Sequence, residues 1–192
     1  MADAGRVIAG SAKGIRLAAP GEGTRPLTDR VKQTLFAILE PELEGARVLD
    51  LFAGSGAAGI EALSRGAAHA TFVERDRGAA RAIHANLERT RLADRARVER
   101  VAVEAFLARP GVEPFDLVLL DPPYEDTPAL AATLERLGAT DAPLTGLARV
   151  VAKHFWRSAP PVTVGLLASD RERRFGETAL TFYRRTDGGR GA

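Results

Sequence analysis

Residues 47–59, RVLDLFAGSGAAG, constrain the fold of this chain more than any other stretch. Residues 48–51 form a short apolar run of the kind that makes a strand buried on both faces. Gly54, Gly56 and Gly59 follow with the spacing Gly-x-Gly-x-x-Gly. Because glycine has no Cβ, the backbone can turn sharply, let a ligand approach closely and begin a helix at about Ala57. The stretch predicts a strand, a cofactor-binding turn and a helix.

The identity of the cofactor depends on two carboxylates near this turn. Glu74 lies 20 residues beyond Gly54, as in the dinucleotide-binding fingerprint, so spacing alone leaves a nicotinamide cofactor open. Asp50 precedes the glycines at a point where a carboxylate can receive the ammonium of a methionine moiety. A pyrophosphate would gain nothing from a negative charge there. This favours S-adenosylmethionine (SAM).

Length and composition limit the remaining possibilities. A chain of 192 residues can form one α/β domain with a small appendage. It has no cysteine, which excludes disulfides and thiolate zinc sites and favours a reducing cytoplasm. No run approaches the roughly 20 apolar residues of a membrane span. The three histidines are too scattered to suggest a metal site. We therefore expect a cytoplasmic, metal-free protein, and a monomer.

Strand and helix signals alternate from residue 47 onward. Strands are predicted at 47–51, 70–74, 97–101, 115–120 and 147–152, and helices near 57–65, 78–90, 103–108 and 128–137. Such alternation implies a mostly parallel sheet with ligands at the carboxyl ends of its strands. Residues 166–175 and 178–185 instead predict an antiparallel hairpin that turns at Gly176 and Glu177. The fold class is therefore α/β, a Rossmann-like class I SAM methyltransferase sheet.

The first 40 residues predict a smaller unit. Residues 6–8 and 15–18 are strand-like and flank a loop of glycine and lysine. Thr28 or Asp29 can cap a helix with apolar residues at helical spacing that ends before Pro41. We expect a small N-terminal extension at 1–40 packed on a methyltransferase domain at 41–186, and a flexible tail at 187–192. Basic residues outnumber acidic ones toward both ends of the chain, which fits a polyanionic partner.

The strand at 115–120 leads directly into the candidate catalytic residues, Asp121, Pro122, Pro123 and Tyr124. Two prolines make a rigid turn that presents carbonyl oxygens and the Asp121 carboxylate outward. An exocyclic amine on a nucleobase is a poor nucleophile because its lone pair is delocalised into the ring. Acceptors on its hydrogens would hold the nitrogen in a nucleophilic geometry, and Tyr124 would stack on the base. The turn predicts methylation of a base amino group.

Six stretches carry a family resemblance: RVIAGSAKGIRL near the start, RPLTDRVKQTLF at 25–36, VLDLFAGSGAAGIEALSRGA at 48–67, FVERDR at 72–77, FDLVLLDPPY at 115–124 and FGETALTFYRR at 175–185. Over nearly its whole length the chain resembles the RsmD-type family of bacterial 16S ribosomal RNA methyltransferases. That family uses SAM to methylate the 2-amino group of one guanine. The resemblance implies the same reaction, and 16S RNA or the small ribosomal subunit as partner.

The resemblance also implies roles for individual residues. Asp50, Gly54 and Gly56 would line the methionine end of SAM, and Glu74 would bind its ribose. The expected cofactor site is completed by Phe52, Ala53, Ser55, Arg75 and Glu104. Relatives tend to have an acid for the adenine amine where Ala102 stands, with Glu104 two residues later. The resemblance further implies that residues 1–40 are an N-terminal RNA-binding extension. The residues that would grip RNA phosphate there are Lys13, Arg16, Arg25, Arg30 and Lys32.

Other functions compete with this prediction. A DNA amino-methyltransferase could act on adenine or cytosine through the same turn, although such enzymes usually need an added region to flip a base out of a duplex. A SAM-binding ribosome assembly factor without catalysis is a second alternative, and the intact residues 121–124 argue against it. A protein-glutamine methyltransferase would be expected to have Asn where Asp121 stands. An oxidoreductase could use the glycine turn for a nicotinamide.

Overall fold

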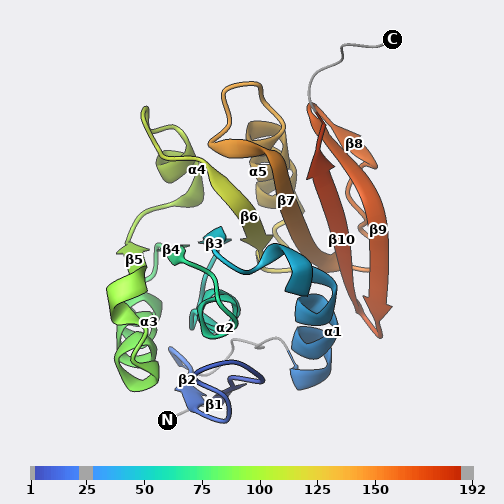
Figure 1. Cartoon of the computed structure of the whole chain (residues 1–192). Coiled ribbons are helices and arrows are strands. Elements are labelled where there is room, and N and C mark those ends of the chain that lie inside the picture. The colour runs from blue at the N-terminus through green and yellow to red at the C-terminus, as the bar shows by residue number, and fades with distance from the viewer. Residues whose placement is uncertain (1–2, 22–27, 187–192) are drawn as a thin grey trace.

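An eight-stranded mixed sheet forms the centre of the protein. The structure is a computed structural model that describes residues 3–21 and 28–186. The strand order is β5-β4-β3-β6-β7-β10-β9-β8 (Figure 1). Its parallel half consists of β3 (Arg47–Leu51), β4 (His69–Val73), β5 (Ala96–Glu99), β6 (Phe115–Leu120) and β7 (Leu144–Phe155). The antiparallel half adds β10 (Thr178–Arg185), β9 (Leu167–Phe175) and the short β8 (Thr163–Val164).

This arrangement confirms the predicted fold class. The parallel strands occur where alternating apolar runs predict them, and β9 and β10 pair as the closing antiparallel hairpin. Two details differ from the expectation. β7 extends by three residues at each end of the predicted 147–152, and β8 was not predicted because two residues carry no detectable periodicity.

Helices cover both faces of the sheet. On one face, α1 (Asp29–Leu39), α2 (Ala57–Ser64) and α3 (Arg77–Thr90) pack in one apolar cluster with β3, β4 and β6. On the other, α4 (Val103–Leu107) and α5 (Thr127–Leu137) pack in a second cluster, and Figure 1 shows α5 behind β7. Short 3-10 turns occur at Glu40–Glu42 and Ala93–Arg95. In the part of the chain described, no helix is long and apolar enough to cross a membrane.

The N-terminal hairpin packs on the main sheet unit through the same apolar cluster. It consists of β1 (Asp3–Arg6) and β2 (Arg16–Ala18), so its first strand begins earlier than the predicted 6–8. Its buried residues Val7 and Leu17 belong to the cluster that also holds α1 and α2. Thr28 is the N-cap of α1, as expected, since its hydroxyl accepts a hydrogen bond from Val31 N–H. The core is thus continuous across residue 40, and the domain division remains a prediction.

The predicted contact of Lys32 with RNA is wrong. Its side chain is fully buried and its Nζ donates to the carbonyl oxygen of Arg6, which ties α1 to the hairpin. Burial also lowers the pKa of Lys32 below its ordinary value. A side chain enclosed in this way cannot reach an RNA phosphate. The sequence suggested a basic outer face for α1, but the hairpin covers that part of the helix.

Candidate active site

Three carboxylates meet at the carboxyl edge of the parallel strands. Asp50 lies on β3, Glu74 directly follows β4, and Asp121 directly follows β6. β3 lies between β4 and β6 in the sheet, so the strand order brings them together. Burial, together with the charges of Asp121 and Glu74, raises the pKa of Asp50 to about 8, although the hydrogen bond from Gly59 N–H acts in the opposite direction. The three predicted acidic positions therefore form one site.

The glycine turn, residues 52–56, joins β3 to α2 through backbone with positive φ angles. Phe52, Gly54 and Gly56 have φ values of 59°, 54° and 76°, a region that residues with a Cβ rarely adopt. Gly56 is the N-cap of α2, so the helix begins at Ala57 as predicted. The positive φ of Phe52 is costly for a bulky side chain and fits a site where the backbone is shaped for a ligand.

Gly59 is required by packing. A Cβ at this position would lie 2.4 Å from Cε1 of Phe72 and 3.1 Å from Oδ2 of Asp50. Its backbone N–H donates a hydrogen bond of 2.9 Å to that same Oδ2. Asp50 is only 2% exposed, and among the described residues no cation pairs with it. The first turn of α2 therefore holds a buried carboxylate that lacks a positive partner.

Glu74 fastens the glycine turn to the end of β4. Its Oε2 accepts from Gly54 N–H at 2.8 Å and its Oε1 accepts from Asp76 N–H at 2.8 Å. A carboxylate has about four lone-pair sites, so both oxygens keep capacity for hydroxyl donors. Arg75 is exposed beside it. The sequence predicted the position of Glu74 but not its contact with the turn.

The DPPY turn, residues 121–124, is held against β7 and β10. Lys153 of β7 forms an ion pair through Nζ with Oδ1 of Asp121. The hydroxyl of Tyr124 hydrogen-bonds Oγ1 of Thr178 at 2.5 Å, which fixes the direction of the ring. Asp126 N–H donates to the carbonyl oxygen of Pro123 at 3.0 Å and closes the loop. The turn is thus a rigid platform beside the glycine turn.

Comparison with known proteins agrees with this architecture. Residues 5–184 match the family described as "Conserved hypothetical protein 95". The chain belongs to this family, the RsmD family.

Its relatives include YlbH of Bacillus subtilis (strain 168), whose name ascribes rRNA methylation to it. YlbH is 40% identical over 183 residues, which are 94% of this chain and 98% of YlbH. Ribosomal RNA small subunit methyltransferase D of Escherichia coli (strain K12) is 47% identical over 120 residues, 62% of this chain and 60% of that protein. The solved structure of yhhF from Escherichia coli, ascribed to the methyltransferases, superposes with a TM-score of 0.85 at 36% identity. It covers 94% of this chain and 97% of that one.

Against this family background, the expected adenine contact stays a prediction. Ala102 is the N-cap of α4 and offers no side-chain hydrogen bond. Glu104 lies in the first turn of α4 with an exposed side chain. The remaining predicted cofactor positions, Ala53 and Ser55, lie in the glycine turn itself. The glycine turn follows β3 and α4 follows β5, so these positions lie at the carboxyl edge of the parallel strands.

Asn86 is a site residue that the sequence did not single out. It is fully buried on α3, and its Nδ2 donates to the carbonyl oxygens of Ser55 and Ala18, each at 2.9 Å. Its Oδ1 accepts from Ala18 N–H at 2.8 Å. One amide thus fastens the glycine turn to the N-terminal hairpin. The sequence held one indication of this role: Asn86 is a polar residue at a position where the helical spacing predicts a buried side chain.

An aromatic row extends from the DPPY turn along the end of β7. The ring centres of Tyr124 and Phe155 lie 6.4 Å apart, and those of Phe155 and Trp156 lie 6.3 Å apart. The guanidinium groups of Arg174 and Arg157 lie 3.5 Å and 4.8 Å from the Trp156 ring centre. Aromatic rings with cations beside them suit single-stranded nucleic acid. The sequence showed the basic bias here but not the row.

The predicted RNA-binding residues of the N-terminal region occupy different settings. Lys13, Arg16 and Arg30 have exposed side chains, and Arg16 forms an ion pair with Asp3. Arg25 lies outside the described residues. Three of the five predicted residues thus have exposed side chains, and their RNA contacts remain a prediction.

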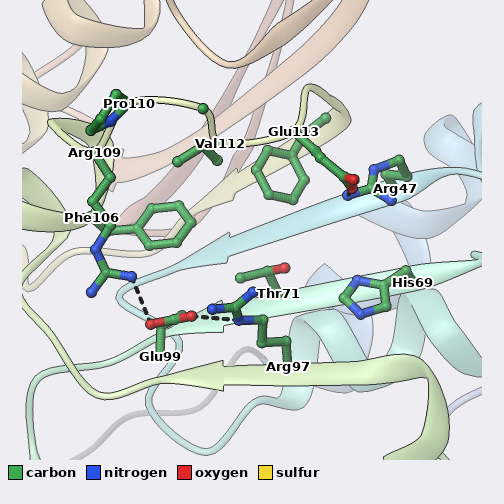
Figure 2. A pocket seen from close by; sticks show the side chains of 12 residues that line it. Arg47, His69, Thr71, Arg97, Glu99, Phe106, Arg109, Pro110, Val112 and Glu113 are labelled. Carbon is green, nitrogen blue, oxygen red and sulfur yellow. Dashed lines mark hydrogen bonds and ion pairs between the residues drawn. The ribbon is translucent and has the colours of Figure 1, made fainter.

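A separate cavity of about 480 Å³ lies over β4 and β5, near α4. Figure 2 shows its charged side chains already paired: Arg97 and Arg109 both reach Glu99, and Arg47 lies beside Glu113. His69 Nδ1 is buried there without a partner among the described residues. None of the predicted site residues lines this cavity. It is distinct from the edge that carries the three carboxylates.

No group of three or more metal-ligating side chains occurs in residues 3–21 and 28–186.

Proposed function

We propose that this protein transfers a methyl group from SAM to the exocyclic 2-amino group of a guanine in 16S ribosomal RNA. The observation that carries the proposal is the position of the DPPY turn beside the glycine turn, on the neighbouring strands β3 and β6. A relative that is 47% identical over 120 residues is named ribosomal RNA small subunit methyltransferase D. We further propose the cytoplasm as its compartment, a monomer as its working form and residues 1–40 as an RNA-binding extension.

The residues at the carboxyl edge fit SAM. The buried Asp50 lacks a cationic partner among the described residues, and the ammonium of a methionine moiety would supply one. Gly54 and Gly56 leave the backbone open to close approach, and Glu74 has acceptor capacity for ribose hydroxyls. When bound, SAM supplies an electrophilic methyl group on a positively charged sulfur. The three clustered carboxylates favour that charge.

The chain itself supplies orientation and electrostatics. Asp121 and the carbonyl oxygen of Pro122 accept the hydrogens of the amino group and hold its nitrogen toward the methyl group. The ring of Tyr124, fixed by Thr178, stacks on the base. After transfer the nitrogen is cationic and strongly acidic, so Asp121 or water takes its proton.

A labelled-methyl assay tests the proposal directly. Purified protein and labelled SAM are incubated separately with small ribosomal subunits, naked 16S RNA and DNA, and the products are digested to nucleosides. We expect label in 2-methylguanosine from ribosomal RNA. Label in DNA adenine or cytosine would instead support a DNA amino-methyltransferase. SAM binding without transfer to any of the three would support a non-catalytic assembly factor.

The raised pKa of Asp50 predicts a pH-dependent affinity for SAM. Below about pH 8 the cofactor-free protein holds Asp50 largely protonated, and binding of the ammonium favours the ionised form, so binding releases a proton. Between about pH 5.5 and 7, where an α-amino group remains protonated, affinity should rise by up to about tenfold per pH unit. Calorimetry in buffers of different ionisation enthalpy measures both quantities.

Asp50→Asn is the matched variant for this measurement. It keeps the size of the side chain and removes the titrating group. We expect weaker binding of SAM at pH 7 and little dependence on pH over the same range. A wild-type affinity that does not change with pH would contradict the pairing of Asp50 with the ammonium.

A further inference from the structure

Lys153 lies beside Asp121 because of the parallel register of β6 and β7. Leu119 of β6 pairs with Val151 of β7, and side chains two residues apart along a strand point to the same face. Asp121 and Lys153 each lie two residues further on, and their side chains meet in an ion pair. The register of the sheet therefore places this pair at the carboxyl edge of β6, beside the DPPY turn.

The ammonium of Lys153 is held in a restricted position. Its side chain is 12% exposed, and Oδ1 of Asp121 is its hydrogen-bond partner among the described residues. An ammonium has three donors, so two remain for a ligand. Nζ also lies 5.0 Å from the centre of the Tyr124 ring. Asp121, Tyr124 and Lys153 thus form one cluster, and a base bound beside Tyr124 would meet both charged groups.

These groups match the hydrogen-bonding edge of one base. Guanine presents, in order, the 2-amino donor, the N1–H donor and the O6 acceptor along its Watson–Crick edge. The carboxylate of Asp121 offers acceptors, and the ammonium of Lys153 offers donors. Adenine presents an amino donor and an N1 acceptor, which place a donor against Lys153 and an acceptor against Asp121. Enzymes that modify bases commonly read this edge.

We propose that Lys153 is a specificity-determining residue that donates a hydrogen bond to O6 of the target guanine, while Asp121 accepts from its 2-amino and N1–H groups. The inference rests on the proposed function, and it explains why the protein would methylate guanine in preference to adenine. The ion pair with Asp121 holds Lys153 ready for O6 before the base arrives.

The test compares two bases at the position that the wild-type protein methylates. Small subunits are assembled from 16S RNA that carries either guanine or 2,6-diaminopurine at that position. Diaminopurine keeps the 2-amino group but has an acceptor at N1 and an amino donor in place of O6. We expect the wild-type kcat/KM to favour guanine by about 100-fold or more, because the analogue leaves polar groups of the site unpaired.

Lys153→Met should lower the preference for guanine at least about tenfold, with an unchanged Kd for SAM. Lys153→Arg should keep most of the preference, because a guanidinium also donates. Arg81→Met removes an exposed cation from α3, which contacts the edge strand β5, and β4, β3 and β6 separate that strand from β7 (Figure 1). It is the matched control for loss of charge. Thermal melting of each variant reports whether it folds.

Three outcomes would count against the proposal. A Lys153→Met variant with wild-type preference would overturn it, even if transfer were slower, because Lys153 would then act only through the placement of Asp121. The wild-type protein gives an independent measure: 2-aminopurine lacks any group at C6, so equal rates on 2-aminopurine and diaminopurine would also overturn it. If the wild-type protein transfers no methyl group to guanine, the proposed function itself is overturned. This result is obtained before any variant is made.

Discussion

Replacing Asp121 with alanine is expected to lower kcat for methyl transfer by about 100-fold to 1,000-fold, as removal of one preorganised electrostatic group does in other enzymes. The variant loses the acceptor for the base amino group and leaves Lys153 without its carboxylate partner. The glycine turn, Asp50 and Glu74 are untouched, so the Kd for SAM should rise far less than kcat falls, and only through the loss of one of the three carboxylates that favour the positive sulfur. Single-turnover transfer of labelled methyl and calorimetry measure the two quantities.

Glu125→Ala is the matched control. Glu125 follows the DPPY turn directly, carries the same charge and has an exposed side chain. Its removal should leave kcat close to the wild-type value. Equal losses in the two variants would show that general negative charge in this loop, and not the Asp121 carboxylate, supports the reaction.

Replacing Gly59 with alanine should lower both the thermal stability and the affinity for SAM. Helix propensity alone predicts a gain of up to about 1 kcal/mol, because Gly59 lies within α2. The added Cβ, however, would lie 2.4 Å from the ring of Phe72, which is fully buried and cannot move freely. Overpacking of this kind costs about 1–3 kcal/mol. Displacement of α2 would also disturb the hydrogen bond from Gly59 to Asp50.

Gly21→Ala serves as the comparison, because a Cβ at Gly21 meets no atom within 4 Å. Thermal melting should show Gly59→Ala below the wild-type midpoint by several degrees, at about 2–4 °C per kcal/mol for a domain of this size. Gly21→Ala should stay near the wild-type midpoint. A rise in the midpoint of Gly59→Ala would mean that helix propensity outweighs the clash with Phe72.

The features that the sequence predicted correctly are those that depend on patterns within a few neighbouring residues. The run at 47–59 specifies its own strand, turn and helix start, because glycine spacing and apolar periodicity act over a few residues. The N-cap of α1 at Thr28 and the closing hairpin of β9 and β10 are local in the same sense. The positions of Asp50, Glu74 and Asp121 at strand ends followed from those elements and from the rules of parallel sheets.

The sequence by itself therefore determined the class of sheet, the glycine turn and the DPPY turn. Tertiary structure alone decided which side chains support them. Lys153 reaches Asp121 across 32 residues, Asn86 reaches Ala18 across 68, and Lys32 reaches Arg6 across 26. Such contacts leave no periodic trace, because they depend on strand register and on which helix face the hairpin covers. Burial makes Lys32 a structural residue. The register of β6 and β7 places Lys153 beside Asp121, and this is the pair that we propose recognises guanine.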